Sequence, residues 1–284
     1  MIDPIFHIAE ADAWESAVRM GVYLTSTRGR SLAEVGFIHC SHRHQVERVA
    51  NAAYRDGGPV VLLTIDPDRL GVEVREEPVG GPETFPHVYG PLSVGAVVAV
   101  EPLRPAPGGL FVPTRSWLSP KLEARPSPIE GLGLFAIGSI EGGETVAVMG
   151  GQAMTDGDLS AHTATRAHWS AAAIDEGLNV LQDDDDPLSL GNHSCDPELW
   201  MADELTLVAR RAIPAGDEAT VDYGLMTVDE AWHMECHCAR IACRGTATGS
   251  DWRRVDLQDR YRGHFSPFIE RRITSGGKAV ARFR

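Results

Sequence analysis

Four of the five cysteines in this 284-residue chain have the types and spacing that most clearly suggest chemistry. They are Cys195, Cys236, Cys238 and Cys243, the last three in the pattern Cys-x-Cys-x4-Cys. A structural zinc ion takes four tetrahedral ligands and favours thiolate sulfur. Because Cys40 falls in a different predicted domain, we expect the other four to hold one zinc ion and to contribute folding energy. His237 is an alternative ligand, and thiols without metal are the other interpretation.

The charge of the chain is uneven. The net charge is −14, but residues 250–284 carry nine Lys or Arg against four Asp or Glu, about +5, which leaves about −19 on the first 249 residues. An acidic body disfavours nonspecific nucleic-acid binding and suits a basic polypeptide partner. Solubility alone, with the basic end packed on the acidic body, explains the same distribution.

The sequence carries no membrane or export pattern. No apolar run is long enough to span a bilayer, and the first residues lack a basic region followed by an apolar stretch. Clustered cysteines of odd number are typical of metal binding rather than of a disulfide framework. We therefore expect a cytoplasmic protein without a membrane partner.

Residues 1–104 have the pattern of a small α+β domain. Apolar residues at helical spacing predict helices over 11–20 and 46–54. Apolar and β-branched runs predict strands at Ile5–Ala9, Val60–Ile65 and Ala96–Val100. A Pro- and Gly-rich stretch over 105–115 predicts a linker to a second domain.

Beyond residue 115 short strands alternate with glycine turns. Strands are predicted at 131–136, 205–209 and 218–223, the last two joined by a turn over 214–217. Asp183–Asp186 predict a solvated loop, which could also attract a cationic substrate. Residues 257–268 predict a helix with a kink or stop near Gly263 or Pro267. The predicted fold class is α+β, with a β-rich domain over 116–249 and a basic helical extension over 250–284.

Motifs between residues 120 and 249 resemble, in order, those of SET-domain protein lysine methyltransferases with a cysteine-rich post-SET segment. The motifs are Gly131-Leu132-Gly133-Leu134-Phe135-Ala136, Asn192-His193-Ser194-Cys195-Asp196-Pro197, residues 209–218 leading into Asp222-Tyr223, and Cys236, Cys238 and Cys243. A lone Gly-x-Gly is common in turns, whereas four ordered motifs are specific. The resemblance implies methyl transfer from S-adenosylmethionine to the amine of a protein lysine, and a zinc-pinned post-SET segment.

The resemblance also implies roles for individual residues. Tyr223 would hold the deprotonated lysine amine behind the methyl carbon, as a base or as a positioning group. The residues that would contact S-adenosylmethionine are Leu132, Gly133, Asn192 and His193. Trp169 would line the cofactor or lysine channel, unless it is a core residue. The chain departs from the family at Glu198, where a loop-shaping Asn is usual.

Residues 3–103 resemble a small bacterial family, domain of unknown function 952. The matching stretches are Ile5-Phe6-His7-Ile8, Gly36-Phe37-Ile38-His39-Cys40-Ser41 and Phe85-Pro86-His87-Val88-Tyr89-Gly90-Pro91-Leu92. That family is similar in fold to ADP-ribosyltransferases, which implies a pocket in a split sheet. The candidates to line it are His7, His39, Ser41 and His87. A metal site, or plain core and loop roles, are the alternatives for these residues.

Three functions therefore compete. The leading one is an S-adenosylmethionine-dependent protein lysine methyltransferase whose substrate is a lysine-bearing protein or peptide that could be basic. The alternative is a non-catalytic, zinc-stabilised protein-binding module, which the Glu198 departure permits. The third places an activity in the N-terminal domain, on a nucleotide or NAD-like ligand. Direct binding of nucleic acid is not expected in any of them.

Overall fold

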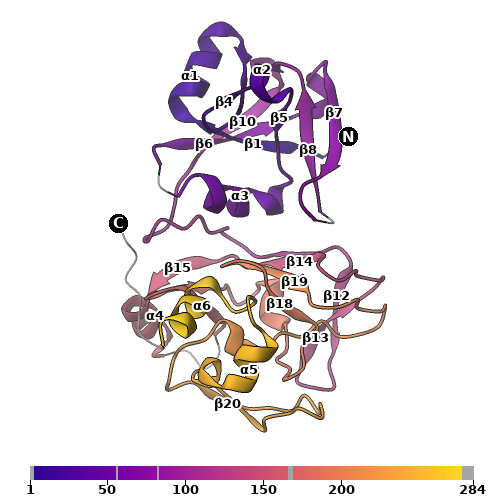
Figure 1. The fold of residues 1–284 in the computed structure, drawn as a ribbon, viewed down its shortest axis with the longest axis vertical. Coiled ribbons are helices and arrows are strands. Elements are labelled where there is room, and N and C mark those ends of the chain that lie inside the picture. Colours follow the sequence, from indigo (N-terminus) through magenta and orange to yellow (C-terminus); the bar gives the residue numbers. More distant parts are fainter. Residues whose placement is uncertain (1–2, 56, 82, 166–168, 277–284) are drawn as a thin grey trace. The chain divides into compact units, whose positions relative to one another are not determined.

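The computed structural model describes residues 3–55, 57–81, 83–165 and 169–276. The chain divides into two compact units, one that ends at Phe111 (unit 1) and one that begins at Val112 (unit 2). The division falls inside the stretch predicted as a linker, 105–115. Each unit has its own sheets and helices (Figure 1).

Unit 1 is built on two three-stranded antiparallel sheets. One has the order β1-β6-β10, from Ile5–Glu10, Val60–Ile65 and Val97–Leu103. The other has the order β5-β8-β7, from Ile38–His39, Thr84–Tyr89 and Glu73–Pro78. Two short pairs join β2 (Val22–Tyr23) to β9 (Leu92–Ser93) and β3 (Thr25–Thr27) to β4 (Arg30–Ser31). The helices are α1 (Ala11–Met20), α2 (Leu32–Val35) and α3 (Val46–Ala53), with 3-10 turns η1 (Arg43–Gln45), η2 (Pro67–Arg69) and η3 (Val94–Ala96).

The helices and strands predicted for this unit are present. Strand β10 begins one residue later than predicted and runs on through Pro102, which an edge strand tolerates because it needs no inward N–H there. Unit 1 also continues past residue 104. Phe111 is 2% exposed, and its backbone N–H and C=O bond to the side chain of Asn51 at 2.8 and 2.9 Å. The contacts of Phe111 therefore hold the start of the predicted linker on unit 1.

Unit 2 is rich in short antiparallel strands. Its largest sheet has the order β11-β14-β19-β18, from Trp117–Leu118, Thr145–Val148, Thr206–Ala209 and Leu199–Met201. The order β15-β17-β16 joins Gln152–Thr155, Leu178–Leu181 and Ala171–Asp175. Two hairpins pair β12 (Leu122–Pro126) with β13 (Leu132–Ala136) and β20 (His233–Glu235) with β21 (Thr246–Thr248). Helical segments are α4 (Asp156–Thr163), η4 (Pro187–Leu190), η5 (Tyr223–Leu225), η6 (Asp251–Arg253), α5 (Val255–Arg260) and α6 (Pro267–Thr274). None of the helices in the described part of the chain has the length and apolar character to cross a bilayer.

The strand predicted over residues 218–223 is wrong. The segment makes only isolated bridges, among them those of Val221 with His193 and Leu199, and Tyr223 already begins η5. The apolar pattern reflects burial on both sides, since residues 219–222 are all at most 6% exposed. The chain turns at Asp222, whose carboxylate accepts the N–H of Gly224 at 3.0 Å and so caps η5.

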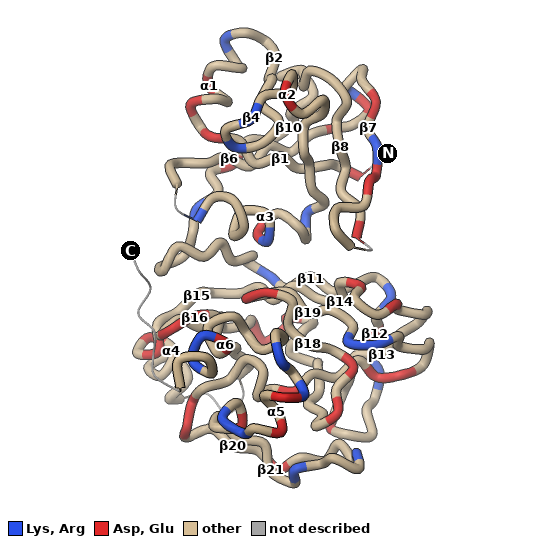
Figure 2. Tube along the Cα trace, viewed as in Figure 1, with Lys and Arg blue, Asp and Glu red and all other residues tan. Residues whose placement is uncertain are grey.

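The predicted tail helix is two helices. Helix α5 ends at Arg260, Gly263 takes a positive φ of 78°, and Pro267 starts α6 rather than ending a helix. From α6, Arg271 pairs with Asp175 at 2.6 Å and Arg272 with Glu176 at 2.5 Å. The basic end thus packs on acidic groups of unit 2, whose charges Figure 2 marks along the trace.

The predicted solvated loop at Asp183–Asp186 is wrong for its last residue. Asp186 is 2% exposed, and its carboxylate accepts the backbone N–H groups of Ser116 at 2.9 Å and Leu188 at 3.0 Å. It caps η4 and ties that turn to the segment before β11. This acid is therefore structural and is not free to attract a cation.

Candidate functional site

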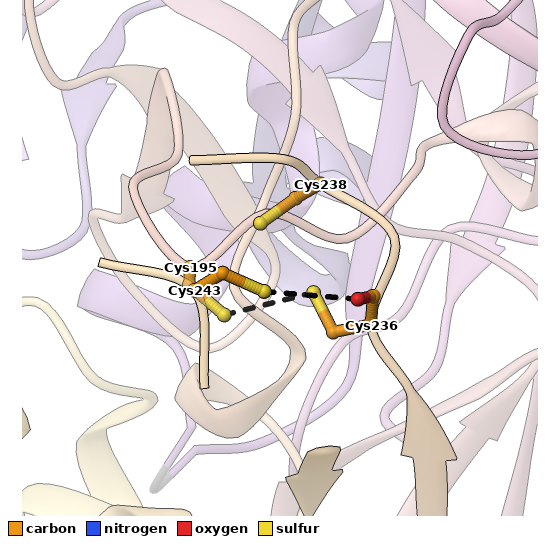
Figure 3. A group of neighbouring side chains, drawn as sticks. All are labelled: Cys195, Cys236, Cys238 and Cys243. Atoms are coloured by element: carbon orange, nitrogen blue, oxygen red, sulfur yellow. Dashed lines mark hydrogen bonds between the residues drawn. The ribbon is translucent and has the colours of Figure 1, made fainter. Parts of the chain in front are cut away.

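The four predicted zinc ligands come together in unit 2. The sulfur atoms of Cys195, Cys236, Cys238 and Cys243 all lie within 4.8 Å of one another (Figure 3). Among the described residues this is the only group of three or more His, Cys, Asp or Glu close enough to share a metal ion. Cys40 is buried in unit 1, and His237 is half exposed, with Glu130 and Glu235 each 3.6 Å from its ring nitrogens.

The donor set fits a metal ion. Burial raises the pKa of Cys195 to about 11 and also raises that of Cys236. Burial acts the same way on Cys238, but hydrogen bonds with the backbone of Cys195 and Arg240 outweigh it and lower its pKa to about 7. A bound cation would favour thiolates at all four positions. The N–H groups of Arg244 and Gly245, 3.3 and 3.4 Å from the sulfurs of Cys195 and Cys243, are donors suited to metal-bound thiolates.

Arg244 joins this cluster to the Asp222-Tyr223 motif. Its guanidinium donates to both carboxylate oxygens of Asp222, at 2.6 and 2.8 Å, and its Nε lies 2.9 Å from a carboxylate oxygen of Asp251. The three side chains are at most 7% exposed. Tyr261 of the tail donates a further hydrogen bond to Asp222 at 3.1 Å. The sequence analysis missed this network, although Arg244 directly follows the last cysteine.

Asp222 and its neighbours hold Tyr223 at a cavity. The backbone N–H of Tyr223 donates to Nδ1 of His193 at 3.2 Å, and its hydroxyl donates to the carbonyl of Gly191 at 2.7 Å. Burial, and then the nearby Glu218 carboxylate, raise the pKa of Tyr223 to about 12. The phenol is therefore protonated at neutral pH, which favours a positioning group over a base.

The cavity beside Tyr223 has a volume of about 860 Å³. Gly191 and Tyr223 line it, together with Trp232, whose ring lies 6.1 Å from that of Tyr223. Trp169 also lines it and is 42% exposed, so the core interpretation of this residue is wrong. Asp156 and Asp229 add acidic groups. Aromatic faces and carboxylates together suit a cationic alkylammonium group.

Asn192 and Gly133 meet on another part of the site. The amide NH₂ of Asn192 is 2.8 Å from a Glu218 carboxylate oxygen and 3.0–3.1 Å from the carbonyls of Leu132 and Glu130. A Cβ on Gly133 would lie 2.0 Å from the same Glu218 oxygen, so glycine is required for this approach. The space that the sequence analysis assigned to a cofactor is filled, on this side, by Glu218. No described residue donates to Oδ1 of Asn192, which is left as an acceptor.

The side chain of His193 faces the cysteine cluster. It is 2% exposed, and its Nε2 lies 3.4 Å from the sulfur of Cys195. Because Nδ1 accepts from the N–H of Tyr223, the neutral ring carries its proton on Nε2 and donates toward sulfur. Burial lowers its pKa, which keeps the ring neutral. Any contact of His193 with a ligand at Asn192 would therefore come from its backbone.

Glu198 has partners that compensate for its departure from the family motif. It is 6% exposed, and its carboxylate accepts from Thr220 at 2.7 Å, Arg240 at 2.9 Å and Arg211 at 3.0 Å. Arg240 belongs to the loop between Cys238 and Cys243. The substitution thus links the loop of Cys195 to the cysteine-rich segment and leaves no buried carboxylate unpaired.

In unit 1 the four predicted pocket residues do not form one site. His7 is buried, with Nδ1 2.7 Å from the carbonyl of His39 and Nε2 3.0 Å from the hydroxyl of Tyr23, and burial lowers its pKa to about 4. Ser41 is buried, and its backbone pairs with Phe6. Only His39 and His87 lie face to edge, with ring centroids 5.3 Å apart. His7 and Ser41 therefore have the core and loop roles that the sequence left as alternatives.

Comparison with known proteins assigns families to parts of both units. Residues 131–224 match the family model of the SET domain. The match begins beside β13 and ends just after Tyr223, so it includes Asn192, His193 and Cys195 of the site. Residues 8–100 match a protein family of unknown function, DUF952. The post-SET zinc segment and the ADP-ribosyltransferase-like fold stay predictions.

Solved structures resemble each unit only distantly. Protein CC0527 from Caulobacter crescentus is 29% identical over 38% of this chain and 91% of its own, with a TM-score of 0.35. The methyltransferase domain of human histone-lysine N-methyltransferase SETMAR is 16% identical over 44% of this chain and 57% of its own, with a TM-score of 0.37. At these TM-scores neither likeness bears on function. No curated protein matches the chain.

The cysteine cluster predicts a metal content. The purified protein should carry about one zinc ion per chain, because one four-thiolate site needs one ion. Cys236→Ser should lose most of it, since the site would keep three thiolates. Elemental analysis of the purified variants measures both. Cys40→Ser is the matched control and should keep its zinc, whereas a folded wild-type chain without zinc would contradict the assignment.

Proposed function

We propose that unit 2 transfers the methyl group of S-adenosylmethionine to the side-chain amine of a protein lysine. The observation that carries the proposal is the position of Tyr223. This tyrosine closes the segment that matches the SET domain, and its hydroxyl reaches the Gly191 carbonyl beside an aromatic, acidic cavity. We also propose that the four cysteines bind a structural zinc ion.

The proposed chemistry makes limited demands on the protein. S-adenosylmethionine would supply a methyl group on a sulfonium, which loses its charge as the bond to sulfur breaks, so no strong acid is required. The protein must hold a neutral amine in line with that methyl group. The hydroxyl of Tyr223 and the carbonyl of Gly191 can orient the amine, and Trp169 and Trp232 can enclose its alkyl chain.

Asn192 is the residue proposed to hold the amino-acid end of the cofactor. Glu218 and two backbone carbonyls fix its NH₂ group, so Oδ1 can accept a hydrogen bond from an ammonium group. Backbone groups of residues 132, 133 and 193 would contribute further contacts. The substrate is proposed to be a lysine in a protein or peptide, and the acids at the cavity favour a basic sequence around it.

Calorimetric titration with S-adenosylmethionine tests the proposal. The wild-type chain should bind, and Asn192→Ala should weaken binding by about 10–100-fold, the effect of one hydrogen bond to a charged group. Glu130→Gln is the matched control, because Glu130 meets Asn192 only through its backbone carbonyl. A zinc-loaded, folded wild-type chain that does not bind would refute methyl transfer and favour the non-catalytic binding module.

A further inference from the structure

The β5-β8-β7 sheet of unit 1 has one apolar face and one face of polar side chains. Side chains alternate between faces along a strand. Ile38, Val88 and Val74 lie in register and pack in the core of unit 1. The next row, His39, His87 and Arg75, is therefore on the opposite face. Glu77 shares that face, two residues beyond Arg75.

Glu77 sets the tautomer of His87. The Nδ1 of His87 lies 2.7 Å from one oxygen of the Glu77 carboxylate, which can only accept, so Nδ1 carries the proton. The hydroxyl of Tyr89 donates to the same carboxylate at 2.9 Å. The other ring nitrogen, Nε2, therefore presents a lone pair. His87 is 4% exposed, and its Nε2 is buried with no hydrogen-bond partner among the described residues.

His39 presents a second lone pair beside the first. The hydroxyl of Ser26 donates its one proton to the carbonyl of Phe37 at 2.5 Å, so its oxygen accepts from Nδ1 of His39 at 3.0 Å. The Nε2 of His39 is then an acceptor, and no described residue donates to it. With the two rings 5.3 Å apart and 74° from coplanar, unpaired acceptors gather at one place.

The unpaired nitrogen of His87 is unusual and costly. A buried acceptor without a donor costs about 1–3 kcal/mol, which an apolar side chain of similar shape would avoid. His7 shows how this unit satisfies a buried imidazole, since both of its nitrogens have partners. A carboxylate that orients an imidazole, with the far nitrogen left open, is the arrangement of an acceptor or general base that awaits a donor.

The charges around the pair indicate a neutral donor. Glu77 is satisfied by His87 and Tyr89, and Glu73 pairs with Arg75 at 2.7 Å, so no free carboxylate remains for a cation. Arg75 also lies over the ring of Tyr89 at 4.1 Å, so no free cation remains for an anion. Phe37, partly buried and stacked on His87 at 4.1 Å, adds an apolar wall.

We propose that unit 1 carries a second binding site, in which Nε2 of His87 and Nε2 of His39 accept hydrogen bonds from two adjacent hydroxyl groups of a neutral ligand, and Glu77 orients His87. The ligand class is a polyol or sugar-like compound with a vicinal diol. The site uses no residue of unit 2 and does not rest on the proposed methyl transfer.

Nitrogen-15 NMR of histidine side chains in the full-length protein tests the site. The probe is cis-cyclopentane-1,2-diol, and its dimethyl ether is the matched compound without O–H donors. His87 should be protonated at Nδ1, and excess diol should shift the Nε2 signals of His39 and His87, whereas the ether should not. Glu77→Gln should weaken the diol affinity about tenfold, because the orienting hydrogen bond loses its charge. Glu73→Gln, whose carboxylate touches neither histidine, should not change it.

Three results would overturn this proposal. A proton on Nε2 of His87 would remove the acceptor, and the wild-type chain shows this without any variant. Equal shifts with diol and ether would mean apolar contact only. No shift with the diol in large excess would leave the buried nitrogen a cost of packing alone. Each can occur whether or not the chain binds S-adenosylmethionine.

Discussion

Tyr223→Phe should keep the fold and lower the rate of methyl transfer by about 10²–10³-fold, the effect of removing one donor aligned with the reacting groups. The ring can keep its packing beside Trp232, since only the hydroxyl that bonds to Gly191 is lost. Transfer of labelled methyl groups to a lysine-containing peptide library measures the effect. The binding of S-adenosylmethionine should change little, so the loss should fall on the rate rather than on cofactor affinity.

The pH dependence distinguishes the two roles of Tyr223. With its pKa raised to about 12, the phenol is protonated throughout the neutral range and ionises only near that value. A positioning tyrosine therefore predicts that the wild-type rate rises with pH only as the substrate amine loses its proton, without a tyrosine ionisation near neutrality. Tyr89→Phe, in unit 1, is the control for removing a phenol hydroxyl. If Tyr223→Phe were as active as that control, Tyr223 would have no part in the reaction.

Arg244→Met should destabilise unit 2 by about 3–5 kcal/mol, the cost of removing one partner from a buried ion pair. The change leaves the carboxylates of Asp222 and Asp251 buried without their cation. Because Asp222 caps the turn that begins with Tyr223, methyl transfer should fall as well. The midpoint of urea unfolding measures the first effect. Zinc content should be unchanged, since Arg244 meets Cys195 through its backbone N–H.

Arg240→Met is the matched control for Arg244. Arg240 lies on the same loop and pairs with Glu198, but its side chain is 43% exposed, so solvent screens the pair and the loss should stay below about 1 kcal/mol. Glu198 would keep Arg211 and Thr220 as partners. Equal losses in the two arginine variants would show that the buried pair with Asp222 has no special weight.

Much of the local structure could be predicted from the residues because short-range patterns control it. Helix 11–20 and strand Val60–Ile65 were predicted with their observed bounds, since apolar spacing decides which face is buried. The segment 218–223 was not, because buried residues alternate with nothing there: neighbours cover both sides. Trp169 was uncertain for a related reason, since its exposure depends on strands that lie far away in the sequence.

The two sites divide in the same way. Residue types and spacing alone identified the four cysteines, Asn192 and Tyr223, because a zinc ion and a specific motif restrict which residues can serve. Only the tertiary structure paired Arg244 with Asp222 and Glu77 with His87. Ion pairs and hydrogen bonds between distant segments follow from how strands and loops pack, and charged side chains have too many possible partners in a sequence for spacing to select one.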